Sequence, residues 1–292
     1  MTDRDDRYIP GVPCWVDIAH PDPEAAAAFY GELFGWTFEE ATPPGSPQRY
    51  AIAGLPGGAV GGLSGPSPEG ERPAWETYVR VGDVDETASK VWGAGGHVLQ
   101  APVDVGTAGR MATFADPGGA RFSVWQARDL HGADVVNEHG SVNFNQLHTQ
   151  DAERAAAFYG AVFGWELLGV GDGSMWALAG YGDFLEQRRP GMREQMAEFG
   201  APERFEDVVA SLLPAEADDA QDRWSVVFGI DDADAAAERT AALGGAVLAR
   251  PFDAPWVRMT VIADPGGATF VASKFVPENR NLGSEASTAS AA

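Results

Sequence analysis

The sequence predicts an α+β protein made of two copies of one domain. The segment AAAAFYGELFGW at 25–36 returns 129 residues later as AAAFYGAVFGW at 155–165. A second echo, ADPGGA, occurs at 115–120 and again at 263–268. Two matching segments in the same order along 292 residues indicate a tandem duplication, and the alternation of strand and helix signals inside each copy gives the α+β class.

The first half of each copy begins with a strand and a capped helix. Residues 12–19 read as extended, and the Ala-rich residues 23–34 read as a helix because Asp22 can cap the first turn and Gly35 can end the last one. Two short strands are expected next, near 50–53 and 58–63. The helix start and stop signals recur in the second copy, at Asp151 and Gly164.

A second half-unit follows a Pro-, Gly- and Ser-rich stretch at 65–73. A strand at 76–81 leads into a helix that Asp83 or Asp85 begins and that Gly95-Gly96 ends. Three further strands are expected at 97–100, 110–115 and 121–126. Each copy therefore reads as β-α-β-β-β twice over.

Charge and composition exclude several function classes. The formal net charge is −23, so we expect neither a nucleic-acid partner nor an anionic membrane surface. Cys14 is the single cysteine, the first seven residues are charged rather than apolar, and no run of about 18 apolar residues occurs. A cytoplasmic protein without disulfides is expected. Phosphate-binding Gly-rich loops and paired cysteines are also missing, which predicts no nucleotide cofactor.

Two motifs carry a resemblance to a known family. The segment FYGxxFGW after the first helix of each copy and the segment ADPGGA before the last strand, within four tandem half-units, resemble the vicinal oxygen chelate superfamily of glyoxalases, bleomycin-resistance proteins and extradiol dioxygenases. The protein looks most like fused two-domain members described as glyoxalase-like or as hydroxylases. The expected layout is an extension at 1–10, domains at 11–127 and 140–275, a linker at 128–139, and a disordered tail at 276–292.

The resemblance implies that each pair of half-units forms a cup-shaped, mostly antiparallel sheet with its helices outside. Ligands of this family bind inside the cup, in many members through a divalent metal held by His and Glu. The family's metal positions fall on Trp15, Glu76 and Ser123 in the first copy and on Phe144, Ser225 and Val271 in the second. Of these side chains only Glu76 is a good metal ligand, so we expect no metal and no cofactor.

Alternation along the strands assigns side chains to the cup, because the apolar set must face the helices. Acid–base groups on the predicted cup face are Asp17, Glu76, Tyr78 and His148, which are the candidate catalytic residues. The candidate substrate-binding residues are Trp15, Arg80, Ser123, Trp125, Phe144, Gln146, Ser225 and Trp256.

Each candidate has an alternative role. Asp17 or Glu76 could pair with Arg80 to satisfy buried charge, or one carboxylate could act as a base whose pKa aromatic neighbours raise. Tyr78 could stabilise an oxyanion or simply pack. His148 could be a general acid or base with Gln146 holding a substrate oxygen, a ligand of an unusual metal site, or an ordinary histidine at a strand end.

The tryptophans and one insertion complete the prediction. Trp36 and Trp165 follow the same motif in both copies and should pack in the core, whereas an aromatic pocket could be lined by Trp15, Trp75, Trp125, Trp176 and Trp256. Residues 184–214 match nothing in the first copy. Spacing of Met192, Phe205, Val208 and Leu212 suggests short amphipathic helices that cover the second cup or serve as a dimer contact.

Three functions remain open at this point. The first is a metal-independent enzyme acting on an aromatic or polyketide-like metabolite, by a hydroxylation, ring-opening or cyclisation step. The second is a binding protein that sequesters an antibiotic-like compound, and a third reading keeps a divalent-metal glyoxalase or dioxygenase. Either a monomer or a homodimer is compatible with the sequence.

Overall fold

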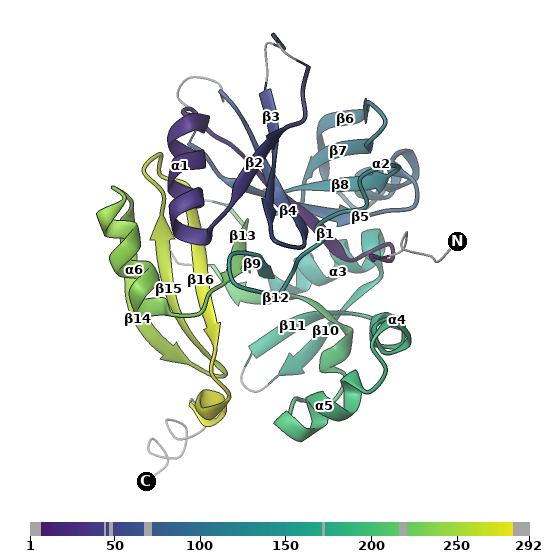
Figure 1. The fold of residues 1–292 in the computed structure, drawn as a ribbon. Coiled ribbons are helices and arrows are strands. Elements are labelled where there is room, and N and C mark those ends of the chain that lie inside the picture. Colours follow the sequence, from purple (N-terminus) through teal and green to yellow (C-terminus); the bar gives the residue numbers. More distant parts are fainter. Residues whose placement is uncertain are drawn as a thin grey trace. The chain divides into compact units, whose positions relative to one another are not determined.

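The computed structural model describes residues 7–43, 45–46, 49–66, 72–170, 173–215 and 221–282. Figure 1 shows the ribbon. The first copy contains β1 (Pro13–Ala19), α1 (Pro23–Phe34), β2 (Thr37–Glu40), β3 (Arg49–Leu55), β4 (Gly58–Gly65), β5 (Trp75–Arg80), α2 (Val84–Gly93), β6 (His97–Val105), β7 (Gly109–Ala115) and β8 (Arg121–Ala127).

The second copy follows the same order with two additional helices. It contains β9 (Val142–Thr149), α3 (Ala152–Phe163), β10 (Trp165–Val170), β11 (Gly173–Leu178), α4 (Tyr181–Arg188), α5 (Met192–Phe199), the 3-10 turn η1 (Phe205–Asp207), β12 (Val208–Pro214), β13 (Arg223–Gly229), α6 (Ala233–Ala242), β14 (Ala246–Ala254), β15 (Val257–Ala263), β16 (Thr269–Phe275) and the 3-10 turn η2 (Pro277–Asn281).

The predicted helix ends are confirmed. Asp22 caps α1 by accepting a hydrogen bond from the Ala25 backbone N–H, and Gly35 ends the helix in the left-handed conformation with φ 76°. Asp151 and Gly164 act in the same way on α3. These are local signals, which explains why they can be read directly from the sequence.

Each copy forms one eight-stranded sheet. The strand order is β2-β3-β4-β1-β5-β8-β7-β6 in the first copy and β10-β11-β12-β9-β13-β16-β15-β14 in the second. The pairs β1/β4, β5/β8, β12/β9 and β13/β16 run parallel, and the hairpin pairs run antiparallel. The mixed sheets, mostly antiparallel and built from paired βαβββ half-units, confirm the predicted fold class.

The packed units differ from the sequence repeats. One compact unit, here the first packed unit, combines Met1–Cys14, Thr77–Gly132 and Phe144–Trp224. The second packed unit combines Trp15–Glu76, Ala133–Asn143 and Ser225–Ala292. Each therefore joins one half-unit from each copy, so that α2 packs against α3 in the first and α1 against α6 in the second (Figure 1).

An aromatic cluster forms the core of the second packed unit. Tyr30, Phe34 and Trp36 follow one another on or just after α1, and their rings lie 5.3–6.0 Å apart. Trp75 and Phe228 complete the cluster with centroids 5.0 Å apart. The prediction that Trp75 could line a ligand pocket is wrong, because its side chain is buried in this core.

The first packed unit repeats this core. Tyr159 stacks on Trp165 with a centroid distance of 5.4 Å, and Trp176 and Trp224 approach Tyr159 edge-on. Trp176 is 0% exposed, so its predicted place in a ligand pocket is also wrong. Phe122 packs against Phe158 of α3, as expected for the helix-facing side of β8.

The motif tryptophans do more than fill space. Trp36 Nε1 donates to the backbone oxygen of Gly140 at 2.6 Å, and Trp165 Nε1 donates to that of Gly11 at 2.7 Å. Each indole is buried and holds the segment that leads into the first strand of a copy. The core position predicted for both residues is confirmed.

The insertion is only partly helical. The helices α4 and α5 are present, but Val208 and Leu212 lie in strand β12, which pairs with β11 and β9. The expected helix over these two residues is therefore wrong, and 208–214 are the counterpart of β4 in the first copy. A cover over the second cup stays a prediction.

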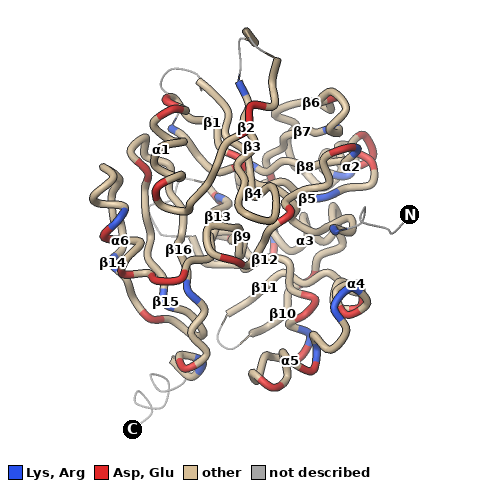
Figure 2. Tube along the Cα trace, in the orientation of Figure 1, with Lys and Arg blue, Asp and Glu red and all other residues tan. Residues whose placement is uncertain are grey.

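Charged side chains stabilise the surface of this insertion. Arg193 of α5 bridges Asp183 and Glu206 at 2.8 and 2.9 Å. Figure 2 shows acidic and basic segments next to one another at α4 and α5, whereas acidic residues dominate the chain as a whole, 43 against 20.

The two ends of the chain lie largely outside the described residues. Of the predicted disordered tail, Pro277–Asn281 form a 3-10 turn, whereas 283–292 are not described. The predicted extension at 1–10 is described only from Arg7 onward, and part of the loop at 65–73 also lies outside the described residues. No described helix is long and apolar enough to span a bilayer.

Candidate functional site

A chain of hydrogen bonds lies on the predicted cup face of β1. Trp15 Nε1 donates to the hydroxyl of Tyr50 at 2.9 Å, and that hydroxyl donates to Asp17 Oδ2 at 3.0 Å. Trp15 and Asp17 are two residues apart on one strand, so their side chains share a face. Tyr50 comes from β3, two strands away in the sheet.

Gly62 makes this contact possible. It lies opposite Asp17 in the parallel pairing of β1 and β4, between Asp17 and the strand that carries Tyr50. A Cβ atom at this position would sit 2.0 Å from the Tyr50 hydroxyl and 3.0 Å from Asp17 Cβ. The missing side chain thus opens the space through which Tyr50 reaches across β4.

The electrostatics keep Tyr50 in its neutral form. Burial raises its pKa well above the usual value, the charge of Asp17 raises it further, and the hydrogen bond from Trp15 lowers it only in part. Asp17 itself is 9% exposed. A neutral phenol that donates to a buried carboxylate stabilises the charged form of that carboxylate and fixes its orientation.

Polar and aromatic residues from β5 and β8 form a second candidate group, in the first packed unit. Tyr78 lies opposite Ser123, and Arg80 lies opposite Trp125, in the parallel pairing of the two strands. Each pair therefore shares a face of the sheet. The Ser123 hydroxyl lies 2.8 Å from that of Thr113, and Trp125 Nε1 donates to the Leu130 backbone oxygen at 2.7 Å.

The candidate residues of β9 also belong to the first packed unit. Phe144, Gln146 and His148 are half-buried and alternate with the buried Asn145 and Leu147. Ser211 of β12 lies opposite Gln146. Its hydroxyl is buried and has no hydrogen-bond partner among the described residues, so it could bind a ligand beside Gln146.

The remaining candidates belong to the second packed unit. Glu76 is half-buried and Ser225 is buried. Trp256 lies in the turn between β14 and β15 with a φ of 69°, and its ring is stacked on Phe275 with an interplanar angle of 4°. Phe275 is more than half exposed, so this stack lies at the surface.

The donor set does not fit the metal that the family resemblance implies. Of the six positions carried over, only Glu76 offers a carboxylate. Among the residues that the structure describes, no three His, Cys, Asp or Glu side chains come together as a group that could hold a metal ion. The side chains at the six carried-over positions therefore do not form a set of ligands that suits the family's metal.

A buried histidine escaped the sequence analysis. His20, placed in a turn by the sequence, is 2% exposed, and its Nε2 lies 3.4 Å from Asp264 Oδ2. Burial lowers the His20 pKa, but Asp264 and the Asp22 backbone oxygen, 2.6 Å from Nδ1, raise it by more. Burial likewise raises the Asp264 pKa, but His20 and the surrounding donors bring it below its usual value.

In the first packed unit a threonine stands in the place of His20, and a buried acid lies beside it. Asp222 is buried near Asp116, and its Oδ2 accepts a hydrogen bond from Thr149, the counterpart of His20. Burial raises the Asp116 pKa, hydrogen bonds from Ala120 and Tyr159 oppose this, and Asp222 adds to the rise. The pKa is therefore raised at Asp116 and lowered at the equivalent Asp264.

Sequence reasoning missed Tyr50, His20 and Ser211. A signal for Tyr50 existed, because Gly61-Gly62 in a strand often marks a place where another group comes close. For His20 and Ser211 no local signal exists, since each depends on a partner or a neighbouring strand far away in the sequence.

Comparisons with known proteins agree with this fold. The Glyoxalase/Bleomycin resistance protein/Dioxygenase superfamily matches residues 14–124 and 141–271. "Putative glyoxylase CFP32" of Mycobacterium tuberculosis is 38% identical over 93% of this chain and 98% of its own. "Anthracycline biosynthesis protein DnrV" of Streptomyces peucetius is 34% identical over 90% and 93%. The Mn(II)-bound glyoxalase of Novosphingobium aromaticivorans has a TM-score of 0.58 at 16% identity, covering 91% of this chain and 82% of its own, which shows the fold alone.

Proposed function

Since the chain belongs to the Glyoxalase/Bleomycin resistance protein/Dioxygenase superfamily, we propose that it is an enzyme acting on an aromatic or polyketide-like metabolite. The name of the Streptomyces peucetius relative, which refers to anthracycline biosynthesis, supports this substrate class. The single observation that carries the proposal is the bond from Tyr50 to Asp17 on the predicted cup face. It fixes a buried carboxylate beside an aromatic side chain.

Asp17 is the proposed base. Its carboxylate takes a proton from a phenol or from an acidic carbon of the substrate, and the bond from Tyr50 stabilises the carboxylate before the transfer. Trp15 positions Tyr50 through its indole N–H. A cyclisation step could follow from such a deprotonation without an oxidant. A hydroxylation or an oxidative ring-opening would in addition need dioxygen as the oxidant.

The other candidates have supporting roles in the proposal. Tyr78, Gln146 and His148 belong to the first packed unit and form a separate candidate set there. In that unit Tyr78 is proposed to donate a hydrogen bond to an oxyanion of a ligand, and His148 to transfer a proton while Gln146 holds a ligand oxygen. Glu76 is the alternative carboxylate. The residues proposed to bind an aromatic ligand are Ser123, Trp125 and Phe144 in the first packed unit, and Ser225 and Trp256 in the second.

Metal independence is part of the proposal. Its support is the chemistry of the side chains at the family's metal positions, where an aromatic or aliphatic residue stands in three of six places. Acid–base chemistry by the chain's own residues does not require a metal at these six positions. A cytoplasmic location and a monomer or homodimer complete the proposal.

Two measurements on the purified chain test this function. Elemental analysis should find no stoichiometric metal, and an anthracycline aglycone or a simple hydroxynaphthoquinone should be converted, as followed by liquid chromatography and mass spectrometry. Asp17→Asn should lower the conversion rate by about 100-fold or more. The exposed Asp129→Asn should leave it unchanged.

Contrary results would separate the alternatives. Stoichiometric metal that is needed for conversion would favour the metal-dependent class of this superfamily. Tight binding of the compounds without conversion, by both wild type and Asp17→Asn, would favour a sequestering protein.

A further inference from the structure

An unpaired arginine lies beside a cavity in the first packed unit. Arg80 ends β5, and its Nη1 atom is buried without a hydrogen-bond partner among the described residues. It forms no ion pair with any described residue either, whereas Arg110, Arg128 and Arg258 all pair with aspartates. Arg80 is half-buried as a whole, and a buried N–H group of its guanidinium without an acceptor is costly, which a ligand carboxylate would relieve.

Cys14, an ionisable neighbour of Arg80, does not neutralise this charge. Cys14 lies close enough for Arg80 to lower its pKa, yet burial dominates and raises that pKa to about 12. The thiol is therefore uncharged at neutral pH. Lys90, which lines a neighbouring cavity of about 530 Å³, is by contrast already paired with Glu86 at 2.9 Å.

The cavity beside Arg80 has a volume of about 230 Å³. It lies between residues 8–10, 80–82 and 126–127, and its lining is polar and apolar in similar measure. Arg80, Tyr8 and Gln126 contribute polar groups, and Ile9, Pro10 and Val81 contribute apolar walls. At roughly 30 Å³ for each water, it could hold about eight waters or one small aromatic acid.

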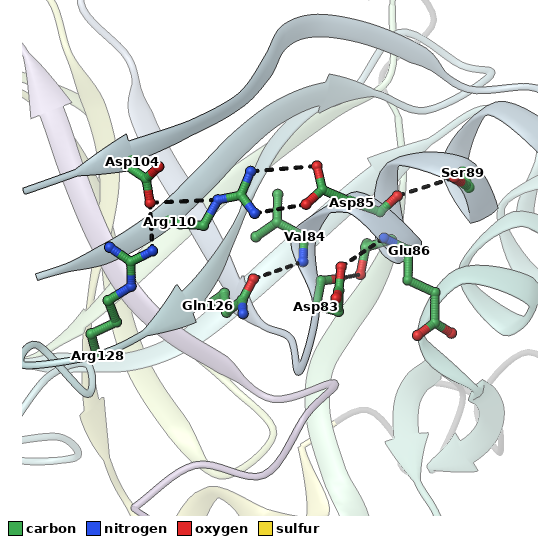
Figure 3. Close-up of polar contacts among 10 residues, drawn as sticks. Asp83, Val84, Asp85, Glu86, Ser89, Asp104, Arg110, Gln126 and Arg128 are labelled. Atoms are coloured by element: carbon green, nitrogen blue, oxygen red, sulfur yellow. Dashed lines mark hydrogen bonds and ion pairs between the residues drawn. The ribbon is translucent and has the colours of Figure 1, made fainter.

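Gln126 provides a second donor at this cavity. Its Oε1 accepts a hydrogen bond from the backbone N–H of Val84 at 3.0 Å (Figure 3), which leaves the amide NH₂ group as its remaining polar function. The Arg128–Asp104–Arg110–Asp85 network in the same view neutralises the other cations around α2. The charge of Arg80 is thus not balanced by this network.

The second copy shows that the fold does not require an arginine at the position of Arg80. Arg80 exchanges backbone hydrogen bonds with Gly11 and Val12, and Gly229 exchanges the equivalent pair with Gly140 and Ser141. A Cβ atom at Gly229 would lie 2.8 Å from the Glu138 backbone oxygen, so no side chain fits there. The same backbone arrangement has room for an arginine side chain in one copy and for no side chain in the other.

We propose that Arg80, with Gln126 and the cavity against residues 8–10, forms a binding subsite for the carboxylate of a small aromatic or aliphatic acid. The planar guanidinium matches the two oxygens of a carboxylate, and the apolar walls match its carbon body. The inference rests on the proposed function, to whose ligand class it adds a carboxylate, but it can be tested without turnover.

Benzoate is the probe, and benzamide is its neutral isostere. By isothermal titration calorimetry we expect benzoate to bind with a dissociation constant of about 1 mM or tighter, and benzamide at least tenfold more weakly. Arg80→Met should weaken benzoate binding at least tenfold, Arg80→Lys by less, and the exposed control Arg128→Met by less than twofold.

Several results would overturn the subsite. Two concern the variants: benzoate binding to Arg80→Met as tightly as to wild type, or Arg128→Met losing as much benzoate affinity as Arg80→Met. Two concern the wild type: inorganic phosphate binding in preference to benzoate, or no benzoate binding at all. If Arg80→Met fails to fold, Arg80→Lys and benzamide still decide the matter. Benzoate binding at Arg80 without turnover of any aromatic compound would overturn only the proposed function.

Discussion

The hydroxyl of Tyr30 donates to Asp264 Oδ2 at 2.9 Å across 234 residues of sequence, and Tyr159 donates to Asp116 in the same way. The tyrosines come from the FYG motif and the aspartates from the ADPGG motif, each pair joining one motif from each copy. The aspartates also accept backbone bonds from their own turns, at Ala120 and Ala268. The two repeated motifs are therefore the two halves of one buried hydrogen bond, made once in each packed unit.

Loss of this bond should destabilise the protein. We expect Tyr30→Phe to lower the free energy of unfolding by about 1–3 kcal/mol, because the ring keeps its packing while Asp264 Oδ2 loses its nearest donor. Urea denaturation at pH 7 measures the change. Tyr181→Phe is the control, since its hydroxyl makes no hydrogen bond within the described residues. A loss no larger than that of the control would contradict the assigned role.

The ion pair of His20 with Asp264 should make stability depend on pH. The folded His20 pKa lies above 6.5, so its contribution is fully present below pH 6.5 and is lost as the pH rises through the folded pKa. The folded Asp264 pKa lies below 3.8, so its contribution is present above pH 3.8 and is lost as the pH falls through the folded pKa.

Unfolding free energies of wild type and His20→Asn between pH 5 and 9 test this, at intervals of about one pH unit. The stability advantage of wild type should shrink as the pH rises above 6.5. The exposed and uncharged Gln100→Asn should give a curve parallel to that of wild type. An advantage of wild type over His20→Asn that stays constant over this range would argue against a charged His20.

Gly62 should be irreplaceable only while Tyr50 is present. We expect Gly62→Ala to displace the Tyr50 ring and to destabilise the chain by about 1–3 kcal/mol, because the added methyl would lie 2.0 Å from the hydroxyl. In a Tyr50→Leu background the same change should cost less than half as much, which a double-mutant cycle measures. Equal costs in the two backgrounds would place the strain elsewhere.

Local chemistry explains which parts of the fold could be predicted. Asp22 and Gly35 bound α1 through contacts within a few residues, so the sequence pattern is sufficient for them. Val208 and Leu212 were assigned to a helix because their spacing suits one, yet pairing with β11 and β9 makes them a strand. Neighbouring strands decide such short segments, and a single sequence does not reveal them.

The same reasoning applies to the candidate site. Trp15 and Asp17 share a strand face, which alternation predicts. Tyr50 joins them only because β3 and β4 pair in one register and Gly62 stands at the crossing point. His20 has its partner 244 residues away, so its burial could not be read from the surrounding turn.

Tyr50 should act on the reaction through Asp17. Tyr50→Phe removes the hydrogen bond that stabilises the carboxylate, so the acid limb of the rate profile should move to higher pH, and conversion should fall by about 10-fold. Trp15→Phe should have a smaller effect, because the bond from Tyr50 to Asp17 remains. The pH dependence of kcat/KM for wild type and both variants distinguishes these outcomes. A Tyr50→Phe enzyme with a lower rate but an unmoved acid limb would show that the phenol contributes to packing alone.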